Sequence, residues 1–450
     1  MTEPDHAALQ FLHLSDIHCT DRFGDGIFDL DADLRRAIND DSADLRKHLG
    51  DFTGILVTGD IAYAATAEDY QKADDWLDGL REIAGSPADR TYVVPGNHDV
   101  DRTVTSVPAV AAFHNELRTC PLNDVDSRLR EWLSASNPDK EIPYRALAAF
   151  NAFAERYGCS VSPQNPFWET TLPLPHGFIL GIHGITSVFC SNSSDDTGNN
   201  KLVVGQAQTL IPISQGRANL SLCHHPPDWL RDADTFQQNM LASTHVQLYG
   251  HKHTYRLNKI DESVVVSAGA AHPERGDTWE PRYNAIRLTI EGTNGAFFLV
   301  VTVYPRVFKA ATRRMQPDYN QTGEDYREFR IELLPPPGHT PSATQRGPVA
   351  RPPEHSAERA TGSQLDEGNP MHPLRRLGYL LAELPPHRRR SIAREFQIED
   401  ESETATNAAF LIQRARETDQ LKALWDAAAE HMSDDTPNPF RGTVPNDQSC

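Results

Sequence analysis

The chain has 450 residues, a formal net charge of −20 at pH 7, 38% hydrophobic and 8% aromatic residues. This length allows more than one domain and a substantial hydrophobic core. The excess of carboxylates repels other polyanions, and no basic cluster stands out, so the composition argues against a long nucleic acid as a partner.

The first residues, the longest apolar run and the cysteines indicate the cellular compartment. The first residues, MTEPDHAALQ, are acidic and polar, unlike a secretory signal. The longest apolar run, GAFFLVVTVY, is too short to cross a bilayer. The six cysteines are scattered without a C-x-x-C pair, which argues against a zinc ribbon and a disulfide-rich secreted domain. We therefore expect a cytoplasmic protein with no membrane partner.

From residue 10 onward, short β-rich runs alternate with helical stretches. The strand-like runs are QFLHLSD, GILVTGD, TYVVPGN, FILGIHG, ANLSLCH, VQLYGH and SVVVSAG, each ending in turn residues. Helical patterns follow the first two, in DLDADLRRAINDDSADLRKHL and AEDYQKADDWLDGLREI. This alternation predicts an α/β layered core, interrupted by a helix-rich insertion at roughly 104–160. AIRLTIEG and AFFLVVTVYP predict a closing hairpin.

The composition changes after residue 334, which we take as the end of the first domain, 1–334. The segment 335–371 is rich in Pro, Gly, Ser and Thr and has few aliphatic residues, so we expect a disordered linker. Helical periodicity then returns in two stripes, Leu374, Leu377, Leu381 and Leu384, and Leu421, Leu424, Trp425 and Ala428. These stripes predict a small all-α module over 372–432, followed by a disordered tail over 433–450.

Side chains that commonly bind metals follow five of the apolar runs. They are Asp16 and His18 in LSDIH, Asp60 in VTGD, Asn97, His98 and Asp99 in PGNHD, His224 and His225 in LCHHPP, and His251 and His253 in YGHKH. The ends of strands are where an α/β sheet presents functional side chains. Imidazole and carboxylate without thiolate suit manganese, iron or zinc.

The spacing of these residues suggests how two ions would be held. A pair of divalent ions needs a bridging carboxylate, and Asp60 lies at the tip of a Gly-Asp turn. Residues two apart on an extended backbone share a side, which would let His251 and His253 act at one site. On the same reasoning Cys19, next to His18, would point away.

In this order, the motifs D-x-H, G-D, G-N-H-D, H-H-P-P and G-H-x-H resemble those of the calcineurin-like metallophosphoesterase superfamily over roughly residues 10–305. The resemblance implies a four-layer α/β/β/α sandwich around two divalent metal ions, manganese, iron or zinc. One ion would take Asp16, His18, Asp60 and His253, and the other Asp60, Asn97, His224 and His251. His225 stays an alternative to His224 as the ligand.

The resemblance also implies roles for two residues that do not bind metal. His98 would lie beside the substrate and stabilise or protonate the leaving oxygen, and Asp99 would orient its ring. The nucleophile would be a hydroxide formed from metal-bound water. Elsewhere, His13, His183 and His245 lie in or beside strand-like runs and are expected to be hydrogen-bonded packing residues, whereas His272 could touch substrate.

The expected substrate is a small phosphodiester, including cyclic nucleotides, because H-H-P-P occurs in branches of this superfamily that act on diesters. A nuclease and a phosphomonoesterase or protein phosphatase remain alternatives. The protein-phosphatase branch has an arginine after G-N-H, and the nearest candidate here, Arg102, is displaced. A scaffold without catalysis is the alternative of another class, but the complete ligand set favours an enzyme.

The C-terminal segments LLAELPPHRRRSIAREFQIEDE and AAFLIQRARETDQLKALWDAAAEH resemble the death-like effector-associated domains of bacterial defence and signalling proteins. The resemblance covers about sixty residues and implies a protein partner. An ordinary helical dimerisation module is the alternative.

Overall fold

The computed structural model describes residues 8–20, 32–195, 202–273, 280–293, 296–338, 374, 377–378, 380–381, 384, 386–395, 408–418 and 420–432. Most of the expected linker and all of the expected tail therefore lie outside the described residues. Among the described helices, none is both long and apolar enough to cross a membrane.

Two β-sheets form the centre of the molecule. The first has the order β12-β11-β10-β1-β2-β3, with β13 paired to β11, and the second has the order β4-β5-β6-β7-β9-β8. In the first sheet the strands are β1 (Leu9–Leu14), β2 (Gly54–Val57), β3 (Thr91–Val93), β10 (Arg282–Thr293), β11 (Ala296–Lys309), β12 (Arg314–Pro317) and β13 (Arg327–Leu333). In the second they are β4 (Trp168–Pro173), β5 (Ile179–Ile185), β6 (Arg217–Cys223), β7 (Val246–Tyr249), β8 (Arg256–Ile260) and β9 (Ser263–Ser267).

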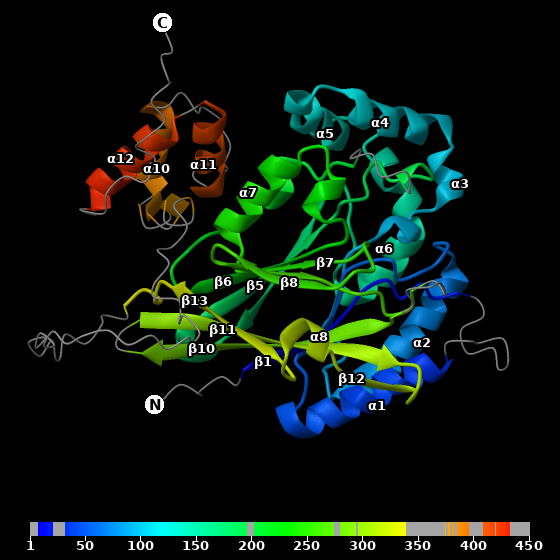
Figure 1. The fold of residues 1–450 in the computed structure, drawn as a ribbon. Helices are drawn as coiled ribbons and strands as arrows, with labels where there is room; N and C mark the ends of the chain where they lie inside the picture. Colours follow the sequence, from blue (N-terminus) through cyan, green and yellow to red (C-terminus); the bar gives the residue numbers. More distant parts are fainter. Residues whose placement is uncertain are drawn as a thin grey trace, which may run out of the picture.

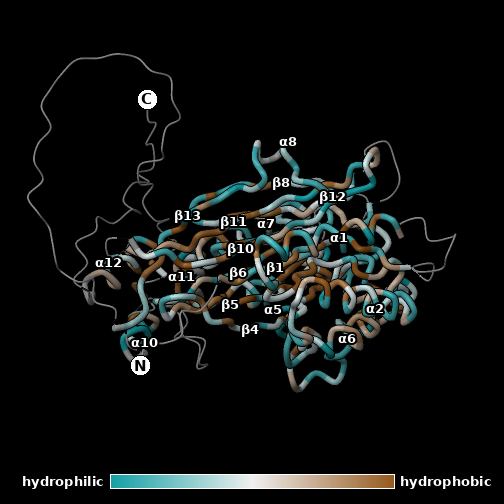
Figure 2. Tube along the Cα trace, turned by 90° about the horizontal axis from the view of Figure 1, so that it is seen from below, coloured by the Kyte–Doolittle hydropathy of each residue, from teal (hydrophilic) through white to brown (hydrophobic). Residues whose placement is uncertain are grey.

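Helices cover the outer faces of both sheets. Figure 1 shows α1 (Ala32–Leu49) and α2 (Ala67–Ala84) beneath the first sheet, and α7 (Ala233–Ser243) above the second. The expected α/β fold with two sheets between helices is confirmed. Figure 2 shows brown, apolar residues along the strands and more teal, polar residues toward the outside. Strands β2 and β6 are buried at every position, as expected for strands covered on both faces.

Local signals in the sequence fix the ends of α2. It begins after Thr66, whose side chain accepts a hydrogen bond from the Asp69 amide at 3.1 Å. It ends at Gly85, which takes the left-handed conformation with φ of 71°. The helix buries one apolar face, made of Tyr70, Ala73, Trp76, Leu77, Leu80 and Ala84.

The helix-rich insertion contains α3 (Arg102–Thr105), α4 (Pro108–Thr119), α5 (Val125–Leu133), the 3-10 segment η4 (Ile142–Leu147) and α6 (Ala148–Ala154). It packs into the main core, because Phe113, Leu117, Phe150 and Phe153 belong to the same buried cluster as the strands. The ring of Tyr70 on α2 stacks on Phe153 with centroids 5.0 Å apart. The insertion thus packs on Tyr70, whose hydroxyl donates to Asp99 in the loop after β3.

The described C-terminal helices are α10 (Pro386–Glu395), α11 (Ala408–Glu417) and α12 (Leu421–Met432). They enclose a second apolar cluster that contains both predicted leucine stripes, including Leu377, Leu381 and Trp425. Ala242 of α7 belongs to this cluster, and Arg416 donates to Asn239 Oδ1 at 3.3 Å, so the helices lie against α7 (Figure 1). The domain boundaries and the death-like resemblance stay predictions.

Candidate metal centre

The motif residues lie where parallel strands of the two sheets end. Strands β1, β2 and β3 are parallel to one another, as are β5, β6, β7 and β9. The side chains follow the strands in the expected manner: Asp16 and His18 after β1, Asp60 after β2, Asn97 to Asp99 after β3, His224 after β6, and His251 and His253 after β7. The carboxyl ends of these strands therefore bring five separate segments to one site.

The backbone at these ends is not extended, contrary to the premise used for the paired histidines. Five of the residues have positive φ: Asp16 (52°), His18 (49°), Asp60 (53°), His251 (69°) and His253 (53°). This left-handed region is uncommon for residues other than glycine, although Asp and His tolerate it better than most. The direction of each side chain is therefore set by its own turn and not by the alternation of side chains along a strand. This is why His251 and His253 contact different residues.

Asp60 lies at the centre of the group. One oxygen, Oδ2, is 3.4 Å from His18 Nε2 and 3.3 Å from His224 Nε2. The other, Oδ1, accepts a hydrogen bond from the His98 amide at 2.8 Å. The residue is 2% exposed, so both carboxylate oxygens are enclosed by protein groups, Oδ2 by the two histidines and Oδ1 by the His98 amide.

The remaining residues fall on either side of Asp60. On one side His253 Nε2 is 3.2 Å from Asp16 Oδ1. On the other, Asn97 Oδ1 is 3.1 Å from His224 Nε2 and 2.9 Å from His251 Nδ1. The two ligand sets that the family resemblance implies would divide in the same way, and they stay a prediction.

The chemistry of the group fits divalent cations. Nitrogen and oxygen atoms of Asp16, His18 and His253 lie within 4.8 Å of one another, as do those of Asp16, Asp60 and His224. Asp16 is buried and its Oδ1 lies 3.2 Å from His253 Nε2, which places a carboxylate oxygen and an imidazole nitrogen where one cation would bind both. Carboxylate, amide oxygen and imidazole together suit manganese, iron or zinc.

Charge at the site also favours a cation. Burial raises the pKa of Asp60, but His224 and His18 outweigh it and hold this pKa well below its usual range. Burial lowers the pKa of His224, but the carboxylates of Asp60 and Asp16 outweigh burial and raise this pKa to about 9. The pKa of His251 is lowered to about 3, first by burial and then by His224. Two buried, ionised carboxylates provide the negative potential that a divalent ion requires.

Backbone carbonyls orient two of the histidines. His18 Nδ1 lies 3.3 Å from the carbonyl oxygen of His272, and His224 Nδ1 lies 2.7 Å from that of Thr58. Because a carbonyl only accepts, each Nδ1 carries the proton and each Nε2 is left for a metal. The sequence gives no signal for these contacts. His272 itself is 6% exposed, and its ring packs on Trp76 with centroids 5.6 Å apart; a contact with substrate stays a prediction.

The ring of His98 is oriented differently from expectation. Its Nδ1 lies 2.8 Å from the carbonyl oxygen of Tyr63, which is the contact that sets the ring. Asp99 instead accepts hydrogen bonds from the Gly96 amide at 2.8 Å and the Tyr70 hydroxyl at 2.9 Å, and from two further amides after Asp60. Burial, together with the charge of Asp60, raises its pKa to about 6. Asp99 therefore joins the loops after β2 and β3, and the expected role of orienting His98 is wrong.

The two histidines of H-H-P-P have different surroundings. His224 faces Asp60 and Asn97, as described above. His225 Nδ1 is 2.9 Å from the Ser187 hydroxyl, and its ring lies beside that of His251 with centroids 4.4 Å apart. The geometry thus favours His224 as the ligand.

The other histidines predicted to be packing residues are hydrogen-bonded in the interior. His13 Nε2 is 3.1 Å from Thr58 Oγ1, and His183 Nε2 is 3.2 Å from Asn219 Oδ1. His245 Nδ1 accepts from the Asn219 amide at 3.0 Å. This expectation is confirmed.

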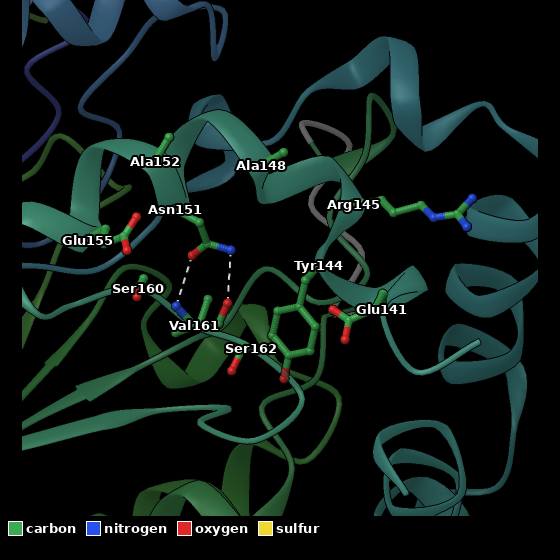
Figure 3. Close-up of a pocket in the computed structure, with 10 residues that line it drawn as sticks. All are labelled: Glu141, Tyr144, Arg145, Ala148, Asn151, Ala152, Glu155, Ser160, Val161 and Ser162. Carbon is green, nitrogen blue, oxygen red and sulfur yellow. Dashed lines mark hydrogen bonds between the residues drawn. The ribbon is translucent and has the colours of Figure 1, made fainter. Parts of the chain in front are cut away.

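A surface hollow of about 430 Å³ lies away from these motifs, beside η4 and α6 (Figure 3). It is lined by Glu141, Tyr144, Arg145, Ala148, Asn151, Ala152, Glu155, Ser160, Val161 and Ser162. Asn151 is already bonded to both the amide and the carbonyl of Val161 at 2.8 Å (Figure 3). The lining residues include none of the motif residues, so the hollow is distinct from the candidate metal centre.

Comparison with known proteins identifies the fold's family. The model of the family described as calcineurin-like phosphoesterase matches residues 9–255, more than half of the chain. Among curated protein sequences, none matches this chain.

The comparison with solved structures finds matches of low sequence identity and low TM-score. Vacuolar Protein Sorting 29 from Cryptosporidium parvum is 12% identical, with a TM-score of 0.30 over 73% of this chain and 100% of that chain. A putative 5'-nucleotidase from Staphylococcus aureus is 13% identical, with a TM-score of 0.33 over 73% of this chain and 54% of that chain. A predicted phosphoesterase from Streptococcus pneumoniae is 11% identical, with a TM-score of 0.26 over 72% of this chain and 99% of that chain. The family match over residues 9–255 carries the conclusion: the chain belongs to the calcineurin-like phosphoesterases and is a metal-dependent phosphoester hydrolase.

Proposed function

We propose that the protein hydrolyses small phosphodiesters, cyclic nucleotides among them, at a centre of two divalent ions. The observation that carries this proposal is the convergence of two ligand sets on Asp60, whose Oδ2 lies within 3.4 Å of both His18 and His224. One ion would be held by Asp16, His18, Asp60 and His253, and the other by Asp60, Asn97, His224 and His251. Manganese, iron or zinc suits these ligands.

The bound ions would supply a water molecule of lowered pKa and neutralise charge on the phosphoryl oxygens. The protein's own contribution beyond the ligands centres on His98. Since its Nδ1 donates to the Tyr63 carbonyl, Nε2 is the atom available to the substrate. A protonated ring can pass that proton to the leaving oxygen, which lowers the barrier for a poor leaving group.

We further propose that the helices within 372–432 bind a protein partner and that the enzyme works in the cytoplasm, in a bacterial defence or signalling system. The second apolar cluster, built mainly from these helices, supports an adaptor role. No disulfide joins the cysteines in the described ranges, which agrees with a reducing compartment.

The test is a substrate panel assayed with protein that has been stripped by chelation and reloaded with manganese. We expect hydrolysis of bis(4-nitrophenyl) phosphate and of at least one cyclic nucleotide, each lost on chelation and restored by the metal. Faster hydrolysis of monoesters than of any diester would contradict the diesterase assignment. Full activity in verified metal-free protein would contradict the dinuclear centre.

A further inference from the structure

Two aromatic side chains border the candidate centre, and the sequence motifs do not include them. Tyr63 lies in the loop after β2, and the residue is 48% exposed. The ring lies 5.3 Å from that of His98 and 6.3 Å from that of His18, measured between centroids. Its backbone is fixed, because its amide donates to the Cys19 carbonyl at 2.9 Å and its own carbonyl holds His98.

Trp229 occupies a different border of the centre. It ends the 3-10 segment η9 (Pro227–Trp229), directly after the H-H-P-P motif. Its ring meets the ring of His251 edge-on, with centroids 4.0 Å apart and planes at 83°. An ion pair between Asp228 and Lys252 ties η9 to the loop that carries His251. The tryptophan is therefore held beside the histidine and remains partly exposed.

The two rings adjoin different ligand sets. Tyr63 contacts His98 and His18, whereas Trp229 contacts His251 and, at 6.2 Å, His225. Asp60 lies between the two sets. A substrate placed over Asp60 would thus have one aromatic face toward the His98 side and another toward the His251 side.

A phosphodiester carries two ester groups that leave the phosphorus in different directions. The leaving oxygen lies opposite the attacking oxygen in an in-line displacement, and under the proposed function it faces His98. We propose that Tyr63 contacts the leaving group of the substrate and Trp229 contacts the ester group that is retained, so that the site prefers diesters with a planar aromatic group on each side. This inference rests on the proposed function and assigns it a substrate class, because nucleobases and aryl rings stack on aromatic side chains.

The experiment uses three substrates with the same 4-nitrophenolate leaving group. They are bis(4-nitrophenyl) phosphate, methyl 4-nitrophenyl phosphate and 4-nitrophenyl phosphate, whose second groups are aromatic, small and absent. Trp229→Leu should lower kcat/KM about 3–30-fold for the first substrate and leave the other two nearly unchanged. Tyr63→Leu should lower it for all three. Trp229→Phe and Tyr63→Phe keep an aromatic ring and should retain most of the wild-type kcat/KM. The matched control is Tyr326→Leu, at a tyrosine that is 42% exposed and lies outside the site.

A binding measurement separates this inference from the diesterase proposal. Diphenylphosphinate and dimethylphosphinate cannot be hydrolysed, and their affinities for the manganese-loaded full chain can be compared by calorimetry. Trp229→Leu and Tyr63→Leu should each weaken the diphenyl compound about 3–30-fold without affecting the dimethyl compound. If neither substitution does so, or if Trp229→Leu harms the methyl ester as much as the bis-aryl ester, the assignment is overturned. If the wild type proves to be a monoesterase, the proposed function fails while the phosphinate result still decides on the two rings.

Discussion

The backbone amide of His98 donates to Oδ1 of Asp60 at 2.8 Å, while Oδ2 of the same carboxylate faces His18 and His224. The residue proposed to serve the substrate thus also positions the residue proposed to bridge the ions. Gly96 makes this contact possible, because a Cβ at that position would overlap the Asp60 carboxylate. The G-N-H-D and G-D motifs therefore act as one unit in space.

Replacing the shared carboxylate should remove both ions. Asp60→Ala is expected to lose both because each ligand set includes this side chain, and Gly96→Ala should weaken binding by displacing the same carboxylate. Metal content after gel filtration, measured by plasma mass spectrometry, checks both variants. Asp51→Ala is the control, since that carboxylate is 67% exposed and pairs with Arg46. A full pair of ions in Asp60→Ala would show that another residue bridges them.

Removing the His98 ring should affect turnover and spare metal binding. His98→Ala is expected to keep both ions and lose about 10²–10⁴ in kcat, the usual range for a positioned acid. The loss should shrink as the leaving group improves, because less proton donation is needed. A series of aryl methyl phosphates with different phenol acidities measures this. Equal losses across the series would point to charge stabilisation instead of proton transfer.

Asp99 should matter for stability more than for chemistry. Asp99→Asn removes a buried acceptor that joins the loops after β2 and β3, and we expect a loss of roughly 1–3 kcal/mol in the free energy of unfolding. Tyr70→Phe, which removes only the hydroxyl donor, should cost less. Urea unfolding provides the values. A change in the leaving-group dependence of kcat with unchanged stability would instead support the role of orienting His98.

Stability at mildly acidic pH should depend on His114 in α4. Burial, together with Arg118, lowers its pKa from the usual 6.5 to about 4, so the folded state favours the neutral ring. Its contribution is complete above about pH 6.5 and is lost as the pH falls toward 4, amounting to roughly 3 kcal/mol. In His114→Gln, urea unfolding should show a weaker decline over this range than in the wild type. Parallel declines would contradict the assignment.

The C-terminal helices should be dispensable for hydrolysis. We expect truncation after Gly338 to preserve both ions and kcat on small substrates, because the described C-terminal helices pack against α7, and α7 carries none of the proposed ligands. Cutting there keeps the bond between the Gly216 amide and the Leu334 carbonyl, at 2.9 Å. Loss of hydrolysis with both ions still bound would mean that the C-terminal helices act on the site through α7.

The sequence predicts the buried strands well because sheets covered on both faces demand continuous apolar runs. The runs ending at Leu14, Val57, Cys223 and Tyr249 are strands in the structure, and the expected hairpin is β10 paired with β11. Strands β4, β8, β12 and β13 were not predicted. They lie toward the sheet edges and carry exposed polar side chains, as in the pattern REFRIEL of β13, so their apolar signal is weak.

At the site, the sequence predicts which segments meet, and tertiary packing decides the rest. Asp99 is adjacent to His98 in the chain, yet its carboxylate turns toward amides that follow Asp60. The carbonyls of Thr58 and His272 act through atoms that every residue possesses. Tyr63 and Trp229 lie beside the site only because their loops fold next to His98 and His251.

The left-handed backbone at Asp16, His18, Asp60, His251 and His253 has an evolutionary consequence. Each such residue costs of order 1–3 kcal/mol, so together they approach the entire net stability of a typical domain, about 5–15 kcal/mol. Selection for heat resistance alone would favour glycine or asparagine at these turns. A descendant freed from the need for hydrolysis would be expected to lose its metal ligands first and to become harder to unfold as it did so.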